Sequence, residues 1–260
     1  MANMMQAEIN RARGVALVSG GSGGIGRAIC EQLHDDGWIV AVGYITKARA
    51  EALAAELATA EVPAIAVPLD MADPDSIRAG IGSLLDRYGR IDAAVFNGGL
   101  AETKRFLDTD EEAWWAEATV NMIGPMLATK LCLPAMIEAG RGVLIGISSD
   151  SAKLGDIGHA PYAAAKYGLT AFLKTIVREH GRHGIRASSV APGPIDTAML
   201  RGSFGGPEAT AVAIEKLRQL VPLRRLGQPH EVAAAVRYLC SDDEYVAGEH
   251  LSVGGGVSMQ

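Results

Sequence analysis

The chain reads Ser19-Gly20-Gly21-Ser22-Gly23-Gly24-Ile25-Gly26 between an apolar run and a longer periodic segment. The run at Val15–Ser19 predicts a strand and the segment at Ile25–His34 predicts a helix, so the glycines form a tight strand-to-helix turn. A turn without Cβ atoms lets a phosphate group approach the backbone, where the helix N-terminus offers free N–H groups. The glycines fit two patterns, GxGxxG at Gly21, Gly23 and Gly26 and GxxxGxG at Gly20, Gly24 and Gly26. Either pattern alone also fits a flexible glycine turn, but its position between a strand and a helix favours a phosphate-binding loop.

Short β-branched runs alternate with Ala-rich periodic segments along the rest of the chain. The predicted strands are Val15–Ser19, Trp38–Gly43, Ala64–Pro68, Ile91–Phe96, Gly142–Ser148, Ile185–Val190 and His250–Val253. The predicted helices are Ile25–His34, Ala48–Ala60, Asp75–Tyr88, Glu111–Ile137, Tyr162–His180, Ala209–Leu220 and His230–Leu239. Continuously apolar strands that alternate with helices indicate a parallel sheet covered on both faces. We therefore predict a single-domain α/β fold with three layers (α/β/α), built on a Rossmann-type doubly wound parallel sheet of about seven strands.

The predicted domain covers residues 14–260, and residues 1–13 form a polar, flexible N-terminal tail. Within the long helical stretch at Glu111–Ile137, Gly124 and Pro125 are expected to introduce a bend.

Composition argues against several classes of protein. A net charge of −6 over 260 residues, with no basic stripe, argues against nucleic acid as a partner. No apolar run of about 18 residues occurs, so no transmembrane helix and no membrane partner are predicted. The N-terminus lacks the apolar segment of a signal peptide, and the three cysteines, Cys30, Cys132 and Cys240, form no CxxC pair. We therefore expect a cytoplasmic protein with reduced cysteines and no metal site.

Tyr162 and Lys166 lie at the start of a predicted helix, in the sequence Pro161-Tyr162-Ala163-Ala164-Ala165-Lys166. Residues four apart in a helix project from the same face, one turn apart. An ammonium beside a phenol favours the phenolate and lowers its pKa toward neutrality, which suits a general acid or base for a carbonyl or alcohol oxygen. The same pair also fits two ordinary residues of an amphipathic helix, so the interpretation depends on the residues around it.

Two further residues complete the pattern. Ser149 follows the predicted strand Gly142–Ser148 and lies thirteen residues before Tyr162, with Ser148 as the alternative if the register slips by one. Asn121 falls within a predicted helix, although asparagine is a poor helix former. With the glycine spacing GxxxGxG, this set resembles the short-chain dehydrogenase/reductase family, and in particular its 3-oxoacyl reductase-like branch. The resemblance runs from about Gly14 to Met259.

The resemblance implies a role for each of these residues. Ser149 would hold the substrate oxygen against Tyr162, which exchanges a proton with it. Lys166 would bind the nicotinamide ribose, lower the pKa of Tyr162 and connect through water to Asn121. The residues expected to bind the cofactor are Gly20, Ser22, Gly23, Gly24, Ile25, Gly26, Tyr44, Thr46, Lys47, Asp70, Met71, Asn97, Gly98, Gly99, Tyr162, Lys166, Pro192, Gly193, Ile195 and Thr197.

Some positions depart from the family pattern. The segment Asn97-Gly98-Gly99 resembles the NNAG motif, but Phe96 replaces its first asparagine and Gly98 replaces its alanine. The C-terminal VDGG motif lacks its aspartate and has Gly254 in that place. In relatives this end of the chain packs near a subunit interface, and the resemblance implies a homotetramer, with a homodimer as the alternative.

The choice of dinucleotide depends on the end of the second predicted strand. In NAD-binding proteins an Asp or Glu about twenty residues beyond the glycine loop binds the ribose 2′-OH. Tyr44 occupies that position, and Thr46, Lys47 and Arg49 offer donors to a 2′-phosphate. Against this, Gly23 stands where many NADP-dependent relatives carry a basic residue, and Lys47 also fits a solvated helix residue. We expect NADP(H), with NAD(H) as the alternative.

The implied activity is hydride transfer between a nicotinamide and a ketone or secondary alcohol, with a small molecule as substrate. The alternatives are an NAD-dependent secondary-alcohol dehydrogenase and a non-catalytic dinucleotide-binding regulator. The intact set of Ser149, Tyr162, Lys166 and Asn121 argues against the regulator.

The substrate side of the site is less clearly marked. The segment 194–220, which contains Gly202, Gly205 and Gly206, is expected to form a mobile lid over the substrate, with a disordered surface loop as the alternative. Four further residues are candidates either for the substrate pocket or for ordinary surface and packing positions: Trp114, Trp115, Leu154 and His159.

Overall fold

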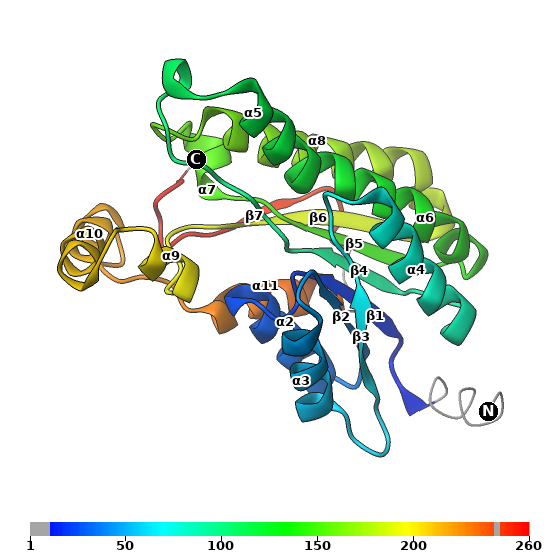
Figure 1. Ribbon diagram of the computed structural model, residues 1–260. Helices are drawn as coiled ribbons and strands as arrows, with labels where there is room; N and C mark the ends of the chain where they lie inside the picture. The colour runs from blue at the N-terminus through cyan, green and yellow to red at the C-terminus, as the bar shows by residue number, and fades with distance from the viewer. Residues whose placement is uncertain (1–10, 242–244, 260) are drawn as a thin grey trace.

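The computed structural model describes residues 11–241 and 245–259, and its centre is a seven-stranded sheet (Figure 1). The strands are β1 (Val15–Ser19), β2 (Ile39–Tyr44), β3 (Ala64–Pro68), β4 (Ala93–Phe96), β5 (Gly142–Ile147), β6 (Ile185–Pro192) and β7 (His250–Val253). Their order in the sheet is β3-β2-β1-β4-β5-β6-β7, and every neighbouring pair is parallel. The predicted Rossmann-type α/β fold is confirmed.

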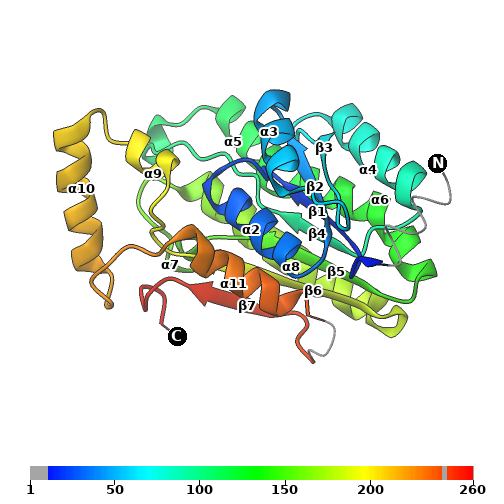
Figure 2. The same ribbon diagram turned by 90° about the horizontal axis from the view of Figure 1, so that it is seen from below.

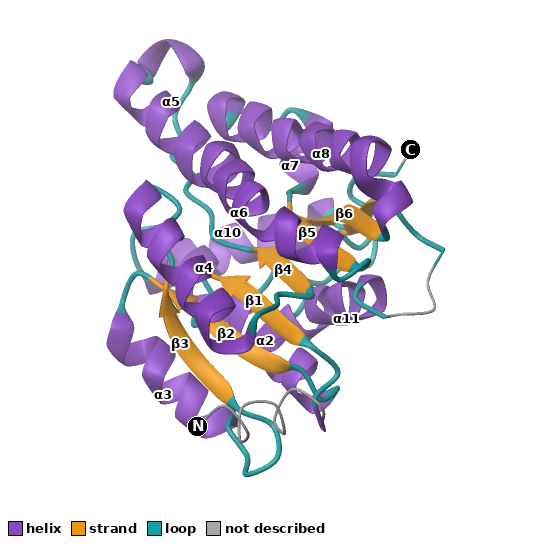
Figure 3. Cartoon of the chain, turned by 90° about the vertical axis from the view of Figure 1, so that its right-hand side faces the viewer, coloured by secondary structure: helices purple, strands orange, loops and turns teal. Residues whose placement is uncertain are grey.

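Helices cover both faces of this sheet (Figure 3). One face carries α2 (Gly24–Asp35), α3 (Lys47–Leu57) and α11 (Pro229–Leu239). The other carries α4 (Pro74–Tyr88), α5 (Glu111–Ala118), α6 (Gly124–Glu138) and α8 (Ala160–His180). Alternate strand residues enter the two cores: Val18 packs in the first and Leu17 in the second. The strands are continuously apolar because both of their faces are buried.

The order in which successive strands are added to the sheet reverses between β1 and β4. From β1 the chain continues to β2 on one side, and from β4 it continues to β5 on the other. Ser19 at the end of β1 pairs with Phe96 at the end of β4, so the loops that follow these strands begin side by side. A crevice at such a point, beyond the carboxyl ends of the strands, is where sheets of this kind bind ligands.

The long helical stretch differs from its prediction. It consists of α5, a π-helical turn at Thr119–Ile123 and α6, and Pro125 lies in the first turn of α6. The irregular turn lies directly before Gly124 and Pro125, where the bend was expected. Its physical cause is Asn121, whose buried side chain accepts a hydrogen bond from the Leu100 N–H (3.2 Å) and donates one to the Leu100 carbonyl (2.7 Å).

Two short helices were not predicted, α7 (Asp150–Leu154) and α9 (Ala198–Gly202). Helices of five residues are shorter than the window of about 11 residues in which periodicity is visible. Residues 1–10 of the predicted tail lie outside the described residues. Its last residue, Arg13, belongs to the folded part, because its N–H donates to the Gly37 carbonyl (2.9 Å) and its guanidinium lies 5.4 Å from the centre of the Trp38 ring.

The segment 194–220 forms α9 and α10 (Pro207–Leu220). Neither helix has a buried residue, and α10 lies to one side of the molecule, away from the sheet (Figure 2). Gly205 and Gly206, the last two of the four residues between the helices, both have positive φ angles, of 74° and 138°. The segment is therefore a pair of exposed helices joined by glycines.

One helical stretch among the described residues, Glu111–Glu138, is long and apolar enough to cross a membrane by length and composition. It packs against α4 and α8, and 39% of its most apolar window is buried inside this chain. Core helices of water-soluble proteins pass the same test, and the buried apolar residues of α6 belong to the second core.

Candidate active site

The glycine loop between β1 and α2 has little room for side chains at Gly20, Gly21, Gly24 and Gly26, where a Cβ would lie 3.2 Å or less from another atom. Gly20 has a φ of +60°, and a Cβ on it would lie 3.2 Å from the Asn97 Nδ2 atom. A Cβ on Gly26 would lie 2.1 Å from the Gly20 carbonyl oxygen. A Cβ on Gly23 would meet only that same oxygen, at an ordinary 3.5 Å. The structure therefore favours the spacing GxxxGxG over GxGxxG, because Gly20, Gly24 and Gly26 all lack room for a Cβ, whereas Gly23 has room for one.

The N-terminus of α2 suits an anionic ligand. Gly23 is the N-cap residue, no side chain caps the helix, and the first turn contains no acidic residue. The first N–H groups of a helix have no partner within it, and the helix dipole favours negative charge there. A pyrophosphate group fits this end of α2.

The loop after β4 holds the glycine loop in place. The Ser19 hydroxyl oxygen accepts hydrogen bonds from the N–H groups of Asn97 (3.0 Å) and Gly98 (3.1 Å). The Asn97 side chain in turn donates to the carbonyls of Ser19 (3.3 Å) and Gly20 (3.2 Å). The expected cofactor residues 97–99 thus lie directly beside the expected pyrophosphate loop.

Tyr162 and Lys166 lie one turn apart at the start of α8. The Lys166 ammonium lies 5.8 Å from the centre of the Tyr162 ring and donates to the Ile147 carbonyl (2.8 Å) at the end of β5. A Cβ on Gly99 would lie 3.3 Å from both the Lys166 Nζ atom and the Asn121 Oδ1 atom. Lys166, Asn121 and the loop after β4 therefore meet at one point.

The two neighbouring serines have different surroundings. Ser148 is buried, and its hydroxyl donates to the Lys166 carbonyl (3.2 Å) within the core. Ser149 is the N-cap residue of α7, accepting from the Ser151 N–H (3.2 Å), and its side chain hydrogen bonds to Tyr162. The geometry therefore brings Ser149, rather than Ser148, to the tyrosine.

The electrostatics of Tyr162 differ from the expectation. Burial raises the pKa of Tyr162 above its ordinary value, the hydrogen bond with Ser149 lowers it, and the charge of Glu117 raises it. Burial lowers the pKa of Lys166 to about 8, so this side chain is still mostly protonated at pH 7. The expected lowering of the tyrosine pKa toward neutrality is not seen in the protein alone, because burial, the largest cause, raises this pKa.

The segment after β6 reaches back to the glycine loop. Ile195 is buried and forms a β-bridge with Gly227, and Gly193 donates to the Val253 carbonyl (3.1 Å). Thr197 is the N-cap residue of α9, and a Cβ on Gly24 would lie 3.0 Å from its methyl group. The expected residues from Pro192 to Thr197 thus lie at the carboxyl ends of the strands, as the glycine loop does.

The residues expected at the adenosine end are more exposed. Tyr44 ends β2, Thr46 and Lys47 begin α3, and Lys47 pairs with Glu51 (3.4 Å). The Asp70 carboxylate accepts from the Ala72 N–H (2.8 Å), which shapes the turn before α4. A buried neighbour, Met71, packs against the start of α6.

Two ionisable residues near Tyr162 were missed or left undecided. Glu117 on α5 is buried; one of its oxygens accepts from the Glu102 N–H (2.5 Å), and the other has no hydrogen-bond partner among the described residues. Its signal in the sequence is an acid one turn before Asn121 in an otherwise apolar stretch. His159 lies 6.0 Å from the Tyr162 ring, centre to centre, and bonds to the Thr103 hydroxyl (3.1 Å), so it lies at the site.

The other candidates for the substrate pocket have ordinary packing or surface positions. Trp114 stacks on Phe106 (5.2 Å between ring centres), while Trp115 and Leu154 are exposed.

The chain belongs to the short-chain dehydrogenase/reductase family. The fold and the site described above fit this family. A family model described as enoyl-(acyl carrier protein) reductase matches residues 20–258. The chain is therefore an NAD(P)-dependent oxidoreductase that acts on CH–OH and C=O groups.

Several relatives are similar over nearly their full length. The 3-oxoacyl-[acyl-carrier-protein] reductase of Synechocystis is 36% identical, over 94% of this chain and 97% of its own. The protein of the same name, FabG, from Staphylococcus aureus (strain N315) is 32% identical over 94% and 98%. Nodulation protein G of Azospirillum brasilense is 34% identical over 95% and 98%.

Proposed function

We propose that the protein is an NADP(H)-dependent reductase of 3-oxoacyl thioesters, with Ser149, Tyr162, Lys166 and Asn121 as its catalytic residues. The observation that carries the proposal is the position of Ser149 and Lys166 around Tyr162, beside the glycine loop. The names of the Synechocystis and Staphylococcus aureus relatives support this substrate class.

The residues of the site divide the work. A dinucleotide bound along the glycine loop supplies the hydride. The Ser149 hydroxyl holds the carbonyl oxygen of the substrate, and the Tyr162 hydroxyl donates its proton to that oxygen as the carbon is reduced. Lys166 keeps a positive charge beside the phenol, and Asn121 holds the loop that contacts Lys166. Tyr162, whose pKa burial raises, carries the proton that the reduction consumes, whereas oxidation of an alcohol would need its phenolate as a base.

The substrate class can be tested with two thioesters of the same chain length. We expect NADPH to be consumed with acetoacetyl-coenzyme A and not with crotonyl-coenzyme A, which has a C=C bond in place of the ketone. Acyl-carrier-protein forms of both show which carrier is preferred. Consumption with the crotonyl thioester alone would refute the proposal, and activity only in the direction of NAD-dependent oxidation of secondary alcohols would favour the alternative dehydrogenase.

We expect Tyr44→Asp to reverse the preference for NADPH over NADH. The new carboxylate would bind the ribose 2′-OH of NADH and repel the 2′-phosphate of NADPH, a change on the order of 100-fold, or about 2.7 kcal/mol. Titration followed by nicotinamide fluorescence measures both dissociation constants. Tyr44→Phe is the matched control, because it keeps the ring without a charge. Tighter binding of NADH by the unaltered protein would instead show that NAD(H) is the cofactor.

Replacing Glu117 by glutamine is expected to shift the pH profile of reduction to lower pH. The negative charge of Glu117 raises the pKa of Tyr162, so its removal lets the tyrosine lose its proton at lower pH, and the rate of reduction then falls at lower pH. The amide oxygen of the glutamine can still accept from the Glu102 N–H. Glu112→Gln, an exposed change on the same helix, should leave the profile unchanged. A profile that does not move in Glu117→Gln would contradict this assignment.

A lid belongs to the same proposal. We infer that α9 and α10 close over bound substrate, because the glycines between them permit rotation and α10 has no buried residue.

We also propose a cytoplasmic homotetramer, with a homodimer as the alternative. The exposed apolar side chains of Trp115, Ile123 and Met126 along α5 to α6 support it. Size-exclusion chromatography that shows a monomer would refute the oligomer.

A further inference from the structure

The first residue of α7, Asp150, is a buried carboxylate directly beside Ser149 in the chain. Its Oδ1 atom accepts hydrogen bonds from the hydroxyls of Ser258 (2.6 Å) and Ser252 (3.2 Å). Lys153, on the same short helix, donates to the Ser252 hydroxyl as well (2.8 Å). We call residues 148–150, which contain Ser149, the catalytic loop. The side chains of Asp150 and Lys153 attach this loop and α7 to the C-terminal segment 252–258.

The second oxygen of Asp150 fills the space beside Gly254. A Cβ on Gly254 would lie only 1.7 Å from the Asp150 Oδ2 atom, and a Cβ on Gly193 would lie 3.1 Å from it. Gly254 does not have a positive φ, so its backbone would accept a side chain if the space were free. The glycine at this position therefore leaves room for the Asp150 carboxylate, whereas its backbone conformation would accept a side chain.

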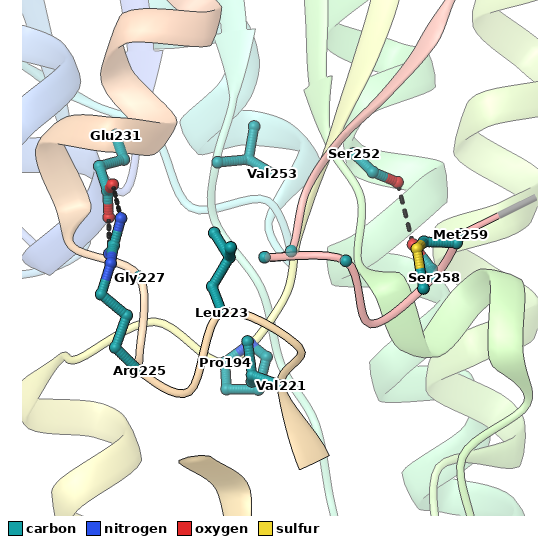
Figure 4. A pocket seen from close by; sticks show the side chains of 13 residues that line it. Pro194, Val221, Leu223, Arg225, Gly227, Glu231, Ser252, Val253, Ser258 and Met259 are labelled. Atoms are coloured by element: carbon teal, nitrogen blue, oxygen red, sulfur yellow. Dashed lines mark hydrogen bonds and ion pairs between the residues drawn. The ribbon is translucent and has the colours of Figure 1, made fainter. Parts of the chain in front are cut away.

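Three functional segments meet at this carboxylate. The catalytic loop supplies Asp150 itself, the segment after β6 supplies Gly193, and the C-terminal segment supplies Gly254. The last two are also joined directly, because the Gly193 N–H donates to the Val253 carbonyl (3.1 Å). The C-terminal segment also lines a cavity of about 380 Å³, and Figure 4 shows Ser252 and Ser258 turned toward each other beside it.

We propose that Asp150 is a positioning residue, whose carboxylate holds the C-terminal segment against the catalytic loop and thereby fixes the direction of the Ser149 hydroxyl. It takes the place of a side chain at position 254, where the sequence has glycine in a motif that otherwise carries aspartate. The effect on Ser149 rests on the proposed function. The claim that only one side chain fits between positions 150 and 254 does not.

Competition between side chains at positions 150 and 254 for one space is tested by thermal unfolding. Four proteins are compared: the unaltered chain, Asp150→Ala, Gly254→Asp and the double variant. Gly254→Asp alone places two side chains in one space and is expected to lower Tm. In the Asp150→Ala background the new aspartate has room and can accept from the serine hydroxyls, so the same change is expected to raise Tm. Additive effects on Tm would overturn the inference. If Asp150→Ala alone does not fold, recovery of a folded protein in the double variant supports it and failure of the double variant contradicts it.

The positioning role is tested by kinetics with NADPH and acetoacetyl-coenzyme A. Asp150→Ala is expected to lower kcat by about 10- to 100-fold, because small displacements of catalytic groups have effects of this size. The dissociation constant of NADPH should stay within about twofold of the unaltered value, because the α2 end of the site is unchanged. Asp150→Asn, whose carbonyl oxygen can accept both serine hydroxyls, should restore most of kcat.

Asp156→Ala is the matched control, because Asp156 is an exposed carboxylate just beyond α7 that also accepts from a serine, Ser151 (2.6 Å). An unchanged kcat in Asp150→Ala, or equal losses in the alanine and asparagine variants, would overturn the positioning role. If the unaltered protein reduces no carbonyl compound, the proposed function fails, and the Tm measurements alone then decide whether Asp150 stands in for a side chain at 254.

Discussion

Replacing Tyr162 by phenylalanine is expected to lower kcat for carbonyl reduction by about 10³-fold while NADPH binding is preserved. The loss has this size because the phenol is the proton donor, and general acid catalysis contributes about 10²- to 10⁴-fold. The ring itself stays, so the contacts with His159 and Lys166 that depend on it stay as well. Initial rates of NADPH consumption and a fluorescence titration of the same samples separate the two effects.

Tyr167→Phe is the control for this change. Tyr167 lies on the same helix, is 53% exposed and contacts His250 rather than Ser149 or Lys166. Its variant should retain full activity. If Tyr162→Phe keeps more than about a tenth of the activity, the tyrosine is not the proton donor, because general acid catalysis contributes more than that.

Replacing Gly26 by alanine is expected to destabilise the fold by about 3 kcal/mol or more and to weaken NADPH binding at least about tenfold. Alanine is the better helix former, so intrinsic propensity alone predicts the opposite sign. The loss arises because the new Cβ would lie 2.1 Å from the Gly20 carbonyl oxygen and 2.7 Å from the Asn97 Nδ2 atom. Either the glycine loop or the loop after β4 must then move, and both border the pyrophosphate site.

Gly23→Ala is the matched control three residues earlier. Its Cβ would have only an ordinary contact, and its φ of −88° suits any residue, so we expect a loss of stability below about 1 kcal/mol. Denaturant unfolding and NADPH titration of the two variants form the comparison. Equal losses at both positions would contradict the glycine spacing that this structure favours.

Much of the fold follows from local patterns in the sequence. The runs at Val15–Ser19, Ala64–Pro68 and His250–Val253 match the strands of the structure at both ends, because each strand of a buried parallel sheet is a short apolar run. Tyr162 and Lys166 could be placed together because a helix fixes residues four apart on one face. Ser149 could be placed beside them only through the family spacing.

Other features depend on contacts between distant parts of the chain. The sequence places Glu117 one turn before Asn121, but only the packing of α5 in the fold shows that its side chain is buried. The relation between Asp150 and Gly254 joins a helix start to the C-terminal segment, and no local pattern encodes such a contact. The pKa of Tyr162 was misjudged for a similar reason: the spacing shows the neighbouring lysine, but the degree of burial is a property of the whole fold.

The central claim, hydride transfer from a nicotinamide to a carbonyl carbon at this site, is tested most directly with NADPH deuterated at both C4 positions of its nicotinamide. The unaltered protein is incubated with this NADPH and acetoacetyl-coenzyme A, and the product is analysed by mass spectrometry. The account predicts a 3-hydroxy product that carries deuterium on the former carbonyl carbon. An unlabelled product, or no product although NADPH binds, would contradict it.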